Sequence, residues 1–188
     1  MAQSFVRLGS KVTMISNSSL LPVEDHDMSD VVQQQLIEEG VSLYLHSTIS
    51  NVAKVDDEVK VLIQTEENQR QEIKGSHLLV ATGRQSNIEH LGLDNAGVDC
   101  QNGHLELDSR LRTSNKKIFA CGDVAGPYLF THMAEYQAGV VLKNTLFHWP
   151  AKAKESVIPW CIFTSPELAR VGLSEREAKQ QGVKHQVY

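Results

Sequence analysis

The chain has 188 residues, of which 41% are hydrophobic and 22% charged, and its formal net charge is −5. This composition is typical of a folded globular protein and is far from that of disordered chains. No long run of Lys and Arg occurs, so we expect no nucleic acid partner. Because no stretch approaches the roughly 18 consecutive apolar residues that cross a bilayer, and the N-terminus lacks a signal-peptide pattern, we expect no membrane partner and a soluble, cytoplasmic protein.

Three cysteines, Cys100, Cys121 and Cys161, are far apart in the sequence and form no C-x-x-C pair. This spacing argues against a structural zinc site or a disulfide framework, and we expect no metal site. Free cysteines are among the most buried residue types. We therefore interpret all three as buried or half-buried thiols that contribute to packing.

The N-terminal quarter of the chain predicts the end of a helix followed by a strand–helix–strand unit. Residues 2–8 place apolar side chains at helical spacing before Gly9. Residues 11–16 and 41–46 are β-branched or apolar runs, and the helical pattern between them, residues 28–39, ends at Gly40. So short a connection predicts a parallel βαβ unit.

Short alternating segments follow between residues 49 and 73 and predict an antiparallel flap. After them, the apolar run over residues 77–81 predicts a buried strand that ends at Thr82 and Gly83. A second apolar run, residues 118–120, predicts another buried strand, which opens onto Gly122 and Asp123. In open α/β sheets, ligands bind at the carboxyl ends of strands.

The last third of the chain begins with a long helix, predicted over residues 129–147. Residues 148–156 contain Pro150 and little apolar surface, which predicts a linker. A strand is expected after it. Ser174, with Glu177 three residues later, predicts a capping box before a short helix, and residues 183–188 predict a strand that has just begun.

Three motifs occur in this order: ATGRQSN (81–87), IFACGDVAG (118–126) and FTSPELARVGLSEREA (163–178). With them the sequence resembles the flavin-dependent pyridine nucleotide-disulfide oxidoreductases, the family of dihydrolipoamide dehydrogenase, glutathione reductase and mercuric reductase. The resemblance covers nearly the whole chain. FTHMAEYQAGVV (130–141) is most similar to the dihydrolipoamide dehydrogenase and mercuric reductase branch.

The resemblance implies an α/β fold: a Rossmann-like NAD(P)-binding domain with an antiparallel flap, part of a second, FAD-binding domain, and the start of an α+β dimerisation domain. The expected boundaries are residues 1–82, 83–149 and 150–188. It also implies a homodimer for the intact parent. In the family the NAD(P) glycine fingerprint lies just before the position of Met1, so we expect an internal fragment that lacks the N-terminal FAD segment and most of the dimerisation domain.

The family's FAD contacts map onto the second motif and onto FTHMAEYQAGVV (130–141). The resemblance implies that Asp123, beside Gly122, holds the ribitol chain of FAD, whereas the alternative is that Asp123 caps its own loop. It also implies that the start of the long helix places backbone amides near the flavin ring, where they favour negative charge on reduced flavin. These residues are Thr131, His132, Met133 and Ala134. We interpret His132 as a packing residue and not as an acid or base.

Contacts to the nicotinamide cofactor are implied at Thr82 and Gly83, where the missing Cβ of glycine permits close approach, and at Ile49, which matches an adenine-flanking position. The alternatives are a simple tight turn and plain core packing. NAD binding uses an acid, and NADP binding an Arg, at the end of the second strand of the unit. Ser16 and Asn17 stand there instead, so NAD versus NADP stays open, with a slight preference for tolerance of NADP.

No catalytic residue is assigned. The family passes hydride from NAD(P)H to FAD and then electrons to a cysteine pair, with a His-Glu pair as acid and base, and no close cysteine pair occurs here. The sequence thus predicts an inactive fragment of a dihydrolipoamide dehydrogenase-like oxidoreductase. The alternative is a non-enzymatic interaction module that binds a partner through an exposed sheet edge or the dimerisation segment.

Overall fold

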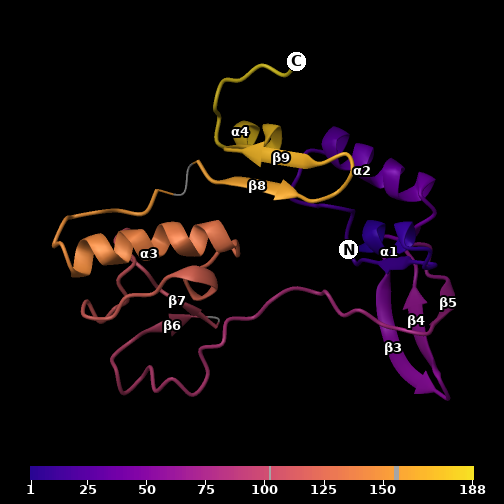
Figure 1. Cartoon of the computed structure of the whole chain (residues 1–188), viewed down its shortest axis with the longest axis horizontal. Coiled ribbons are helices and arrows are strands. Elements are labelled where there is room, and N and C mark those ends of the chain that lie inside the picture. The colour runs from indigo at the N-terminus through magenta and orange to yellow at the C-terminus, as the bar shows by residue number, and fades with distance from the viewer. Residues whose placement is uncertain (102, 155–156) are drawn as a thin grey trace. The chain divides into compact units, whose positions relative to one another are not determined.

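The computed structural model describes every residue except 102, 155 and 156, and it divides into two compact units (Figure 1). Unit 1 comprises Met1–Ala81 and Cys161–Tyr188, and unit 2 comprises Thr82–Trp160. Helices and strands occur in both units, in agreement with the α/β class expected from the sequence. Each unit is described by itself below.

Unit 1 contains the predicted parallel βαβ element. Strands β1 (Thr13–Ile15) and β2 (Ser42–Tyr44) pair in parallel, and α2 (His26–Glu38) connects them. Helix α1 (Ala2–Arg7) precedes β1, as predicted. Helix α2 starts two residues earlier than expected and stops where Gly40 adopts a φ of 94°, with the amide of Val41 donating to the carbonyl of Leu36 at 2.9 Å. This left-handed closure is the usual reason for glycine at a helix end.

The predicted antiparallel flap is present. Strands β3 (Thr48–Val55), β4 (Glu58–Gln64) and β5 (Arg70–Gly75) form a sheet in the order β3-β4-β5. Side chains of the central strand β4 alternate between buried and exposed. Val61 and Ile63 are 5% and 1% exposed, and Leu62 between them is 38% exposed. This period of two explains why the sequence alone predicted the element.

The C-terminal segment of unit 1 packs on the βαβ element. Strands β8 (Pro159–Ile162) and β9 (Leu168–Val171) pair with each other, and α4 (Glu175–Gln180) follows. Leu168 belongs to the same buried cluster as four residues of the N-terminal region, and Ile162 packs against this cluster. The four are Leu20, Val32, Leu36 and Val41. Residues more than a hundred positions apart therefore share one core.

The predicted capping box of α4 is confirmed. The Ser174 hydroxyl accepts from the Glu177 amide at 3.1 Å, and the Ser174 amide donates to the Glu177 carboxylate at 2.8 Å. Asp25, which is the N-cap of α2, accepts from the backbone amides of Glu175 and Arg176 at 2.9 and 3.3 Å. The backbone amides at the start of α4 thus find acceptors both in their own helix turn and in a residue of the N-terminal region.

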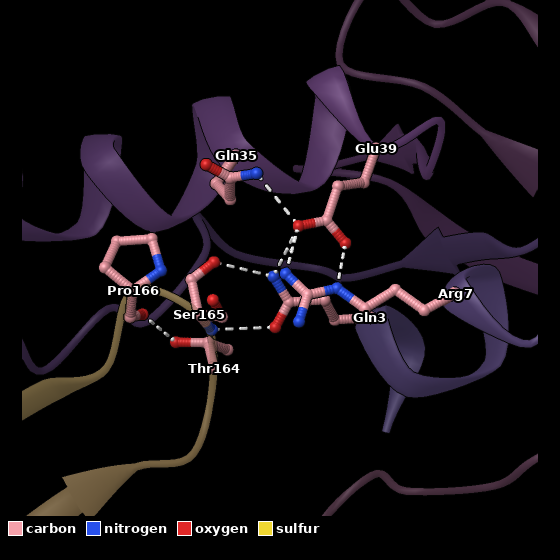
Figure 2. A network of polar contacts seen from close by, with 7 residues as sticks. All are labelled: Gln3, Arg7, Gln35, Glu39, Thr164, Ser165 and Pro166. Carbon is pink, nitrogen blue, oxygen red and sulfur yellow. Dashed lines mark hydrogen bonds and ion pairs between the residues drawn. The ribbon is translucent and has the colours of Figure 1, made fainter.

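A polar network joins α1, the end of α2 and the loop after β8 (Figure 2). The buried Gln3 side chain donates to the Ser165 carbonyl at 2.8 Å and accepts from the Ser165 amide at 2.9 Å. Gln3 and Arg7 also donate to the Glu39 carboxylate, at 2.6 to 2.9 Å. The hydrogen bond from Arg7 is the main cause that lowers the pKa of Glu39 from 4.5 to about 2.

Unit 2 has less regular structure. Its elements are β6 (Cys100–Gln101), β7 (His104–Leu105), the 3-10 turn η1 (Gly122–Ala125) and the long helix α3 (Thr131–Thr145). Helix α3 confirms the helix predicted over residues 129–147. The predicted linker is irregular over residues 148–154, and its last two residues lie outside the described part of the chain.

Three predicted strands do not form. Residues 76–81 are irregular, and Leu78, Leu79 and Val80 are 46%, 58% and 71% exposed. Residues 118–120 contribute a single bridge, between Phe119 and Arg112, and residues 183–188 are irregular. A strand needs neighbours to receive its backbone hydrogen bonds, and no strand among the described residues pairs with the first or the last of these segments.

The expectation for the cysteines is correct only in part. Cys161 is half-buried, but Cys100 and Cys121 are exposed, so the packing role expected for Cys121 is wrong in this structure. Cys121 follows a run that forms a single bridge and no regular strand. None of the helices in the described ranges has the length and apolar character needed to cross a bilayer.

Candidate cofactor-binding site

The candidate site in unit 2 is built on the turn that carries Asp123. The turn begins at Gly122, whose φ of 79° lies in the left-handed region that glycine adopts without strain. A Cβ added at Gly122 would stand 3.4 Å from the Cβ of Ala134 on α3. The Gly122 amide donates to the side-chain oxygen of Gln137, also on α3, at 2.8 Å. Helix α3 therefore holds the turn from one side.

Asp123 directs its carboxylate to Arg84. The Nη1 atom of Arg84 donates to Oδ2 of Asp123 at 2.9 Å, and a second, longer contact of 3.4 Å reaches the Leu129 carbonyl. The side chains of Arg84 and Asp123 are 64% and 50% exposed. Solvent weakens such a pair to about 0–1 kcal/mol, and a carboxylate has further lone pairs. Asp123 can therefore accept additional hydrogen bonds from a ligand.

A pocket of about 880 Å³ opens beside this carboxylate. Its volume lies within the range of about 300–1,000 Å³ that small-molecule sites occupy. Polar side chains after Gly83 and the Asp123 carboxylate line one part of it, and apolar side chains such as Leu105, Val124 and Leu129 line the rest, which suits a ligand with both hydroxyl groups and apolar surface. The lining residues are 84–87, His104, Leu105, 123–127 and Leu129.

The start of α3 supplies fewer free amides than the sequence suggested. The amides of Met133 and Ala134 both donate to the Phe130 carbonyl at 3.1 Å. Helix geometry leaves the amides of Thr131 and His132, at the first two positions, without an intrahelical acceptor. Of the four amides predicted near the flavin ring, Thr131 and His132 are therefore the two that helix geometry leaves available to a ligand.

At the start of α3, Met133 is buried, whereas Thr131 and His132 are exposed. Met133 is 2% exposed and belongs to the core of unit 2. The His132 ring stacks on the Phe130 ring, with centroids 5.3 Å apart and planes 9° apart. His132 is nevertheless exposed, so its interpretation as a packing residue stays a prediction.

The predicted nicotinamide-cofactor residues are divided between the two units. Thr82 and Gly83 are exposed at the start of unit 2, and Gly83 has a φ of 116° and open space where a Cβ would stand. In unit 1, the Ser16 carbonyl, at the end of β1, accepts from the Ser47 amide at 2.8 Å. This bond brings Ser16 close to the start of β3, where Ile49 is 43% exposed.

Two residues of the site were not predicted. Arg84 lies within the first motif, and the presence of a lone cation next to a glycine turn was the available signal. Gln137 lies on the buried stripe of α3 with Met133 and Val140, and a polar side chain on an apolar stripe was its signal. Neither signal identifies the partner atom, which only the tertiary structure shows.

Two family models match the chain. The family model described as pyridine nucleotide-disulphide oxidoreductase matches residues 1–139, and that of the family's dimerisation domain matches residues 158–188. The chain belongs to this family. Its members use flavin and nicotinamide cofactors.

Relatives of this pyridine nucleotide-disulphide oxidoreductase chain include two kinds of enzyme. The chain is 36% identical over 184 residues to the mercuric reductase of Lysinibacillus sphaericus, which covers 97% of the chain and 34% of the relative. It is 34% identical over 176 residues to the dihydrolipoyl dehydrogenase of Bacillus subtilis. This match covers 93% of the chain and 38% of the relative. The chain thus spans between a third and two fifths of the length of these relatives.

Solved structures agree with this family assignment. The Cu(II) complex of the HOCl-induced flavoprotein disulfide reductase RclA from Escherichia coli superposes with a TM-score of 0.84 at 30% identity, covering 95% of the chain and 41% of RclA. LpdA from Mycobacterium tuberculosis superposes with a TM-score of 0.84 at 26% identity. This match covers 97% of the chain and 39% of LpdA. The fold is therefore that of a flavoprotein disulfide reductase fragment.

Proposed function

We propose that the chain supplies part of the FAD site and part of the NAD(P) site of an oxidoreductase that passes electrons between NAD(P)H, FAD and a thiol, disulfide or related acceptor. The observation that carries the proposal is the half-exposed Asp123 carboxylate beside a pocket of about 880 Å³, on a turn anchored to α3. FAD, when bound, would supply the capacity to accept a hydride and pass electrons on.

The residues of unit 2 fit the ribitol and ring of a flavin. Asp123 would accept hydrogen bonds from ribitol hydroxyls, and Gly122 would support the site by letting the turn pack closely on α3, because it has no Cβ. The free amides of Thr131 and His132 would favour negative charge on the ring, since a helix start carries a partial positive charge. No residue of this chain is proposed as catalytic.

Unit 1 is proposed to contact the nicotinamide cofactor. Ser16 is hydrogen-bonded to Ser47, which directly precedes the strand that contains Ile49. A neutral hydroxyl at Ser16 neither requires a free ribose 2′-OH nor repels a 2′-phosphate. Thr82 and Gly83 of unit 2 are also proposed as contacts to a nicotinamide cofactor. The proposed domains are residues 1–82, 83–149 and 150–188, with a homodimer for the intact parent, which the dimerisation-domain match supports.

The chain by itself is proposed to be inactive. We expect the purified chain to show no flavin absorbance, to bind added FAD weakly and not to bleach it when NADH is added. The Asp123→Ala variant should bind FAD about tenfold or more weakly, because a hydrogen bond to a charged group is lost. The matched control is Asp99→Ala, which removes another exposed carboxylate of unit 2 and should leave the affinity unchanged.

Two results would contradict the proposal. Equal FAD affinity of the wild-type chain and Asp123→Ala, measured by quenching of FAD fluorescence, would remove Asp123 from the site. NADH-dependent bleaching at nearly one FAD per chain would show that the chain is an active enzyme without further segments.

A second candidate function is a non-enzymatic interaction module that keeps the flavoprotein scaffold. The observation that favours it is the exposed apolar run Leu78, Leu79 and Val80, whose backbone pairs with no strand among the described residues. Light scattering distinguishes the two functions. A defined dimer without flavin supports the module, whereas a monomer that binds FAD supports the cofactor site.

A further inference from the structure

We propose that Gln137 is the positioning residue that sets the conformation of the turn carrying Asp123. The proposal rests on the proposed function of Asp123 as a flavin contact. It assigns a function to a buried polar side chain whose position on α3 is otherwise explained only by packing.

The contact itself is short and partly buried. Gln137 is 1% exposed, and its side-chain oxygen lies 2.8 Å from the amide of Gly122. A hydrogen bond out of contact with water is electrostatically stronger than one at the surface, and a buried polar group left unpaired is costly. The Gly122 amide is therefore strongly directed towards α3.

This amide sits at the point where the backbone departs from an extended path. Gly122 has a φ of 79°, and the residue before it, Cys121, is extended with φ and ψ of −146° and 160°. The next residue is Asp123. The orientation of the peptide at Gly122 sets the direction of the backbone at Asp123. The hydrogen bond to Gln137 therefore sets the position of the Asp123 side chain.

Helix α3 is a suitable anchor for the turn. Met133, Gln137 and Val140 follow the helical spacing and are 2%, 1% and 4% exposed, so the Gln137 side chain projects from the buried face. The Arg84 guanidinium on the other side of Asp123 is 64% exposed and free to exchange with solvent or ligand. Of the two contacts, the hydrogen bond that the Gly122 amide donates to Gln137 is the more persistent constraint.

A simple packing role for Gln137 makes a different prediction from a positioning role. If Gln137 only fills space, Gln137→Met should preserve the turn, since methionine has a similar size and shape. If it positions the turn, Gln137→Met should free the Gly122 amide, and Gln137→Glu should keep it bonded because a carboxylate also accepts. Gln137→Glu should nevertheless be the less stable variant, since it buries a charge.

The experiment uses the full 188-residue chain and NMR. In Gln137→Met we expect the Gly122 amide to exchange with D₂O about tenfold faster, and the carboxyl carbon signal of Asp123 to shift. In Gln137→Glu we expect wild-type protection of Gly122 despite a lower Tm. The control is Val140→Ala, which should lower the Tm through lost packing without changing either signal, because it lies one turn away on the same face.

We thus expect the ranking of the variants by Tm to differ from their ranking by protection of the Gly122 amide from exchange. Wild-type protection and an unchanged Asp123 signal in Gln137→Met would overturn the proposal, as would loss of Gly122 protection in a folded Gln137→Glu. An equal effect in Val140→Ala would also overturn it. If Gln137→Met does not fold, the Gln137→Glu and Val140→Ala arms still decide.

The proposed function is tested separately. FAD titration of Asp123→Ala reports whether Asp123 contacts flavin, and the NMR readouts require no flavin. If Asp123→Ala does not weaken FAD binding while Gln137→Met frees Gly122, the flavin assignment fails but the positioning contact stands. If Asp123→Ala weakens FAD binding and Gln137→Met changes neither Gly122 nor Asp123, the positioning proposal alone fails.

Discussion

Gly122 and Gly139 show how the same residue type serves opposite purposes in unit 2. Gly122 adopts a left-handed φ of 79° next to Ala134, and so needs to be glycine for conformational reasons. Gly139 lies inside α3, where an added Cβ would meet no atom within 4 Å. Glycine in a helix interior weakens the helix, since its backbone loses more entropy on folding.

The two Gly→Ala substitutions should therefore have opposite effects on stability. We expect Gly122→Ala to lower the free energy of unfolding by about 1–2 kcal/mol, the cost of a left-handed residue with a Cβ. We expect Gly139→Ala to raise it by about 0.5–1 kcal/mol. Urea unfolding followed by circular dichroism measures both, and a stabilising Gly122→Ala would contradict the conformational role of the turn.

At the scale of elements, the link between α1, α2 and the loop after β8 depends on one carboxylate. Glu39 receives hydrogen bonds from Arg7, Gln35 and Gln3, and Gln3 in turn holds the Ser165 backbone (Figure 2). The pKa of Glu39 is lowered to about 2, first by the hydrogen bond from Arg7 and against the opposing effect of burial. Folding is therefore linked to the ionisation of Glu39.

The sign of this linkage gives a pH prediction. A lowered pKa in the folded state means that the stabilisation is complete above the ordinary value of 4.5 and is lost as the pH falls towards about 2. Glu39→Gln should flatten the decline of the free energy of unfolding across this window. The matched control is Glu38→Gln, an exposed neighbour that bonds Gln34 of its own helix, and it should leave the decline unchanged. A decline in Glu39→Gln as steep as in wild type would contradict the role of the network.

At the scale of the whole molecule, segments from both ends of the chain form unit 1, and unit 2 lies between them in the sequence. The C-terminal segment contributes Leu168 to the buried cluster and Ser165 to the network of Gln3. Burial of apolar surface and specific hydrogen bonds therefore hold it to the N-terminal region. The family models match these two parts of unit 1 separately, but the structure makes them one unit.

A cleavage experiment tests whether these contacts hold the C-terminal segment. With a protease site inserted after Lys154, we expect the cleaved C-terminal piece to stay bound during size-exclusion chromatography. Leu168→Ala should release it, since emptying a buried leucine site costs about 2–5 kcal/mol. The control is Phe163→Ala, because Phe163 is 83% exposed and its loss should not matter. Release of the unsubstituted piece would show that the linker holds the segment.

The sequence by itself determined the elements whose causes are local. Apolar periodicity and the glycine at position 40 predicted the βαβ element and α3, alternation predicted the flap, and Ser174 with Glu177 predicted the capping box. The motifs also predicted the family. Each of these depends on residues a few positions apart, so the chain's own order contains the information.

The tertiary structure alone decided what depends on distant partners. It left residues 76–81 exposed because an apolar run becomes a buried strand only when other strands accept its hydrogen bonds. It used the amides of Met133 and Ala134 inside α3, and it paired Asp123 with Arg84 and Gly122 with Gln137. A polar side chain finds its acceptor or donor through space, and no sequence pattern states where that partner lies.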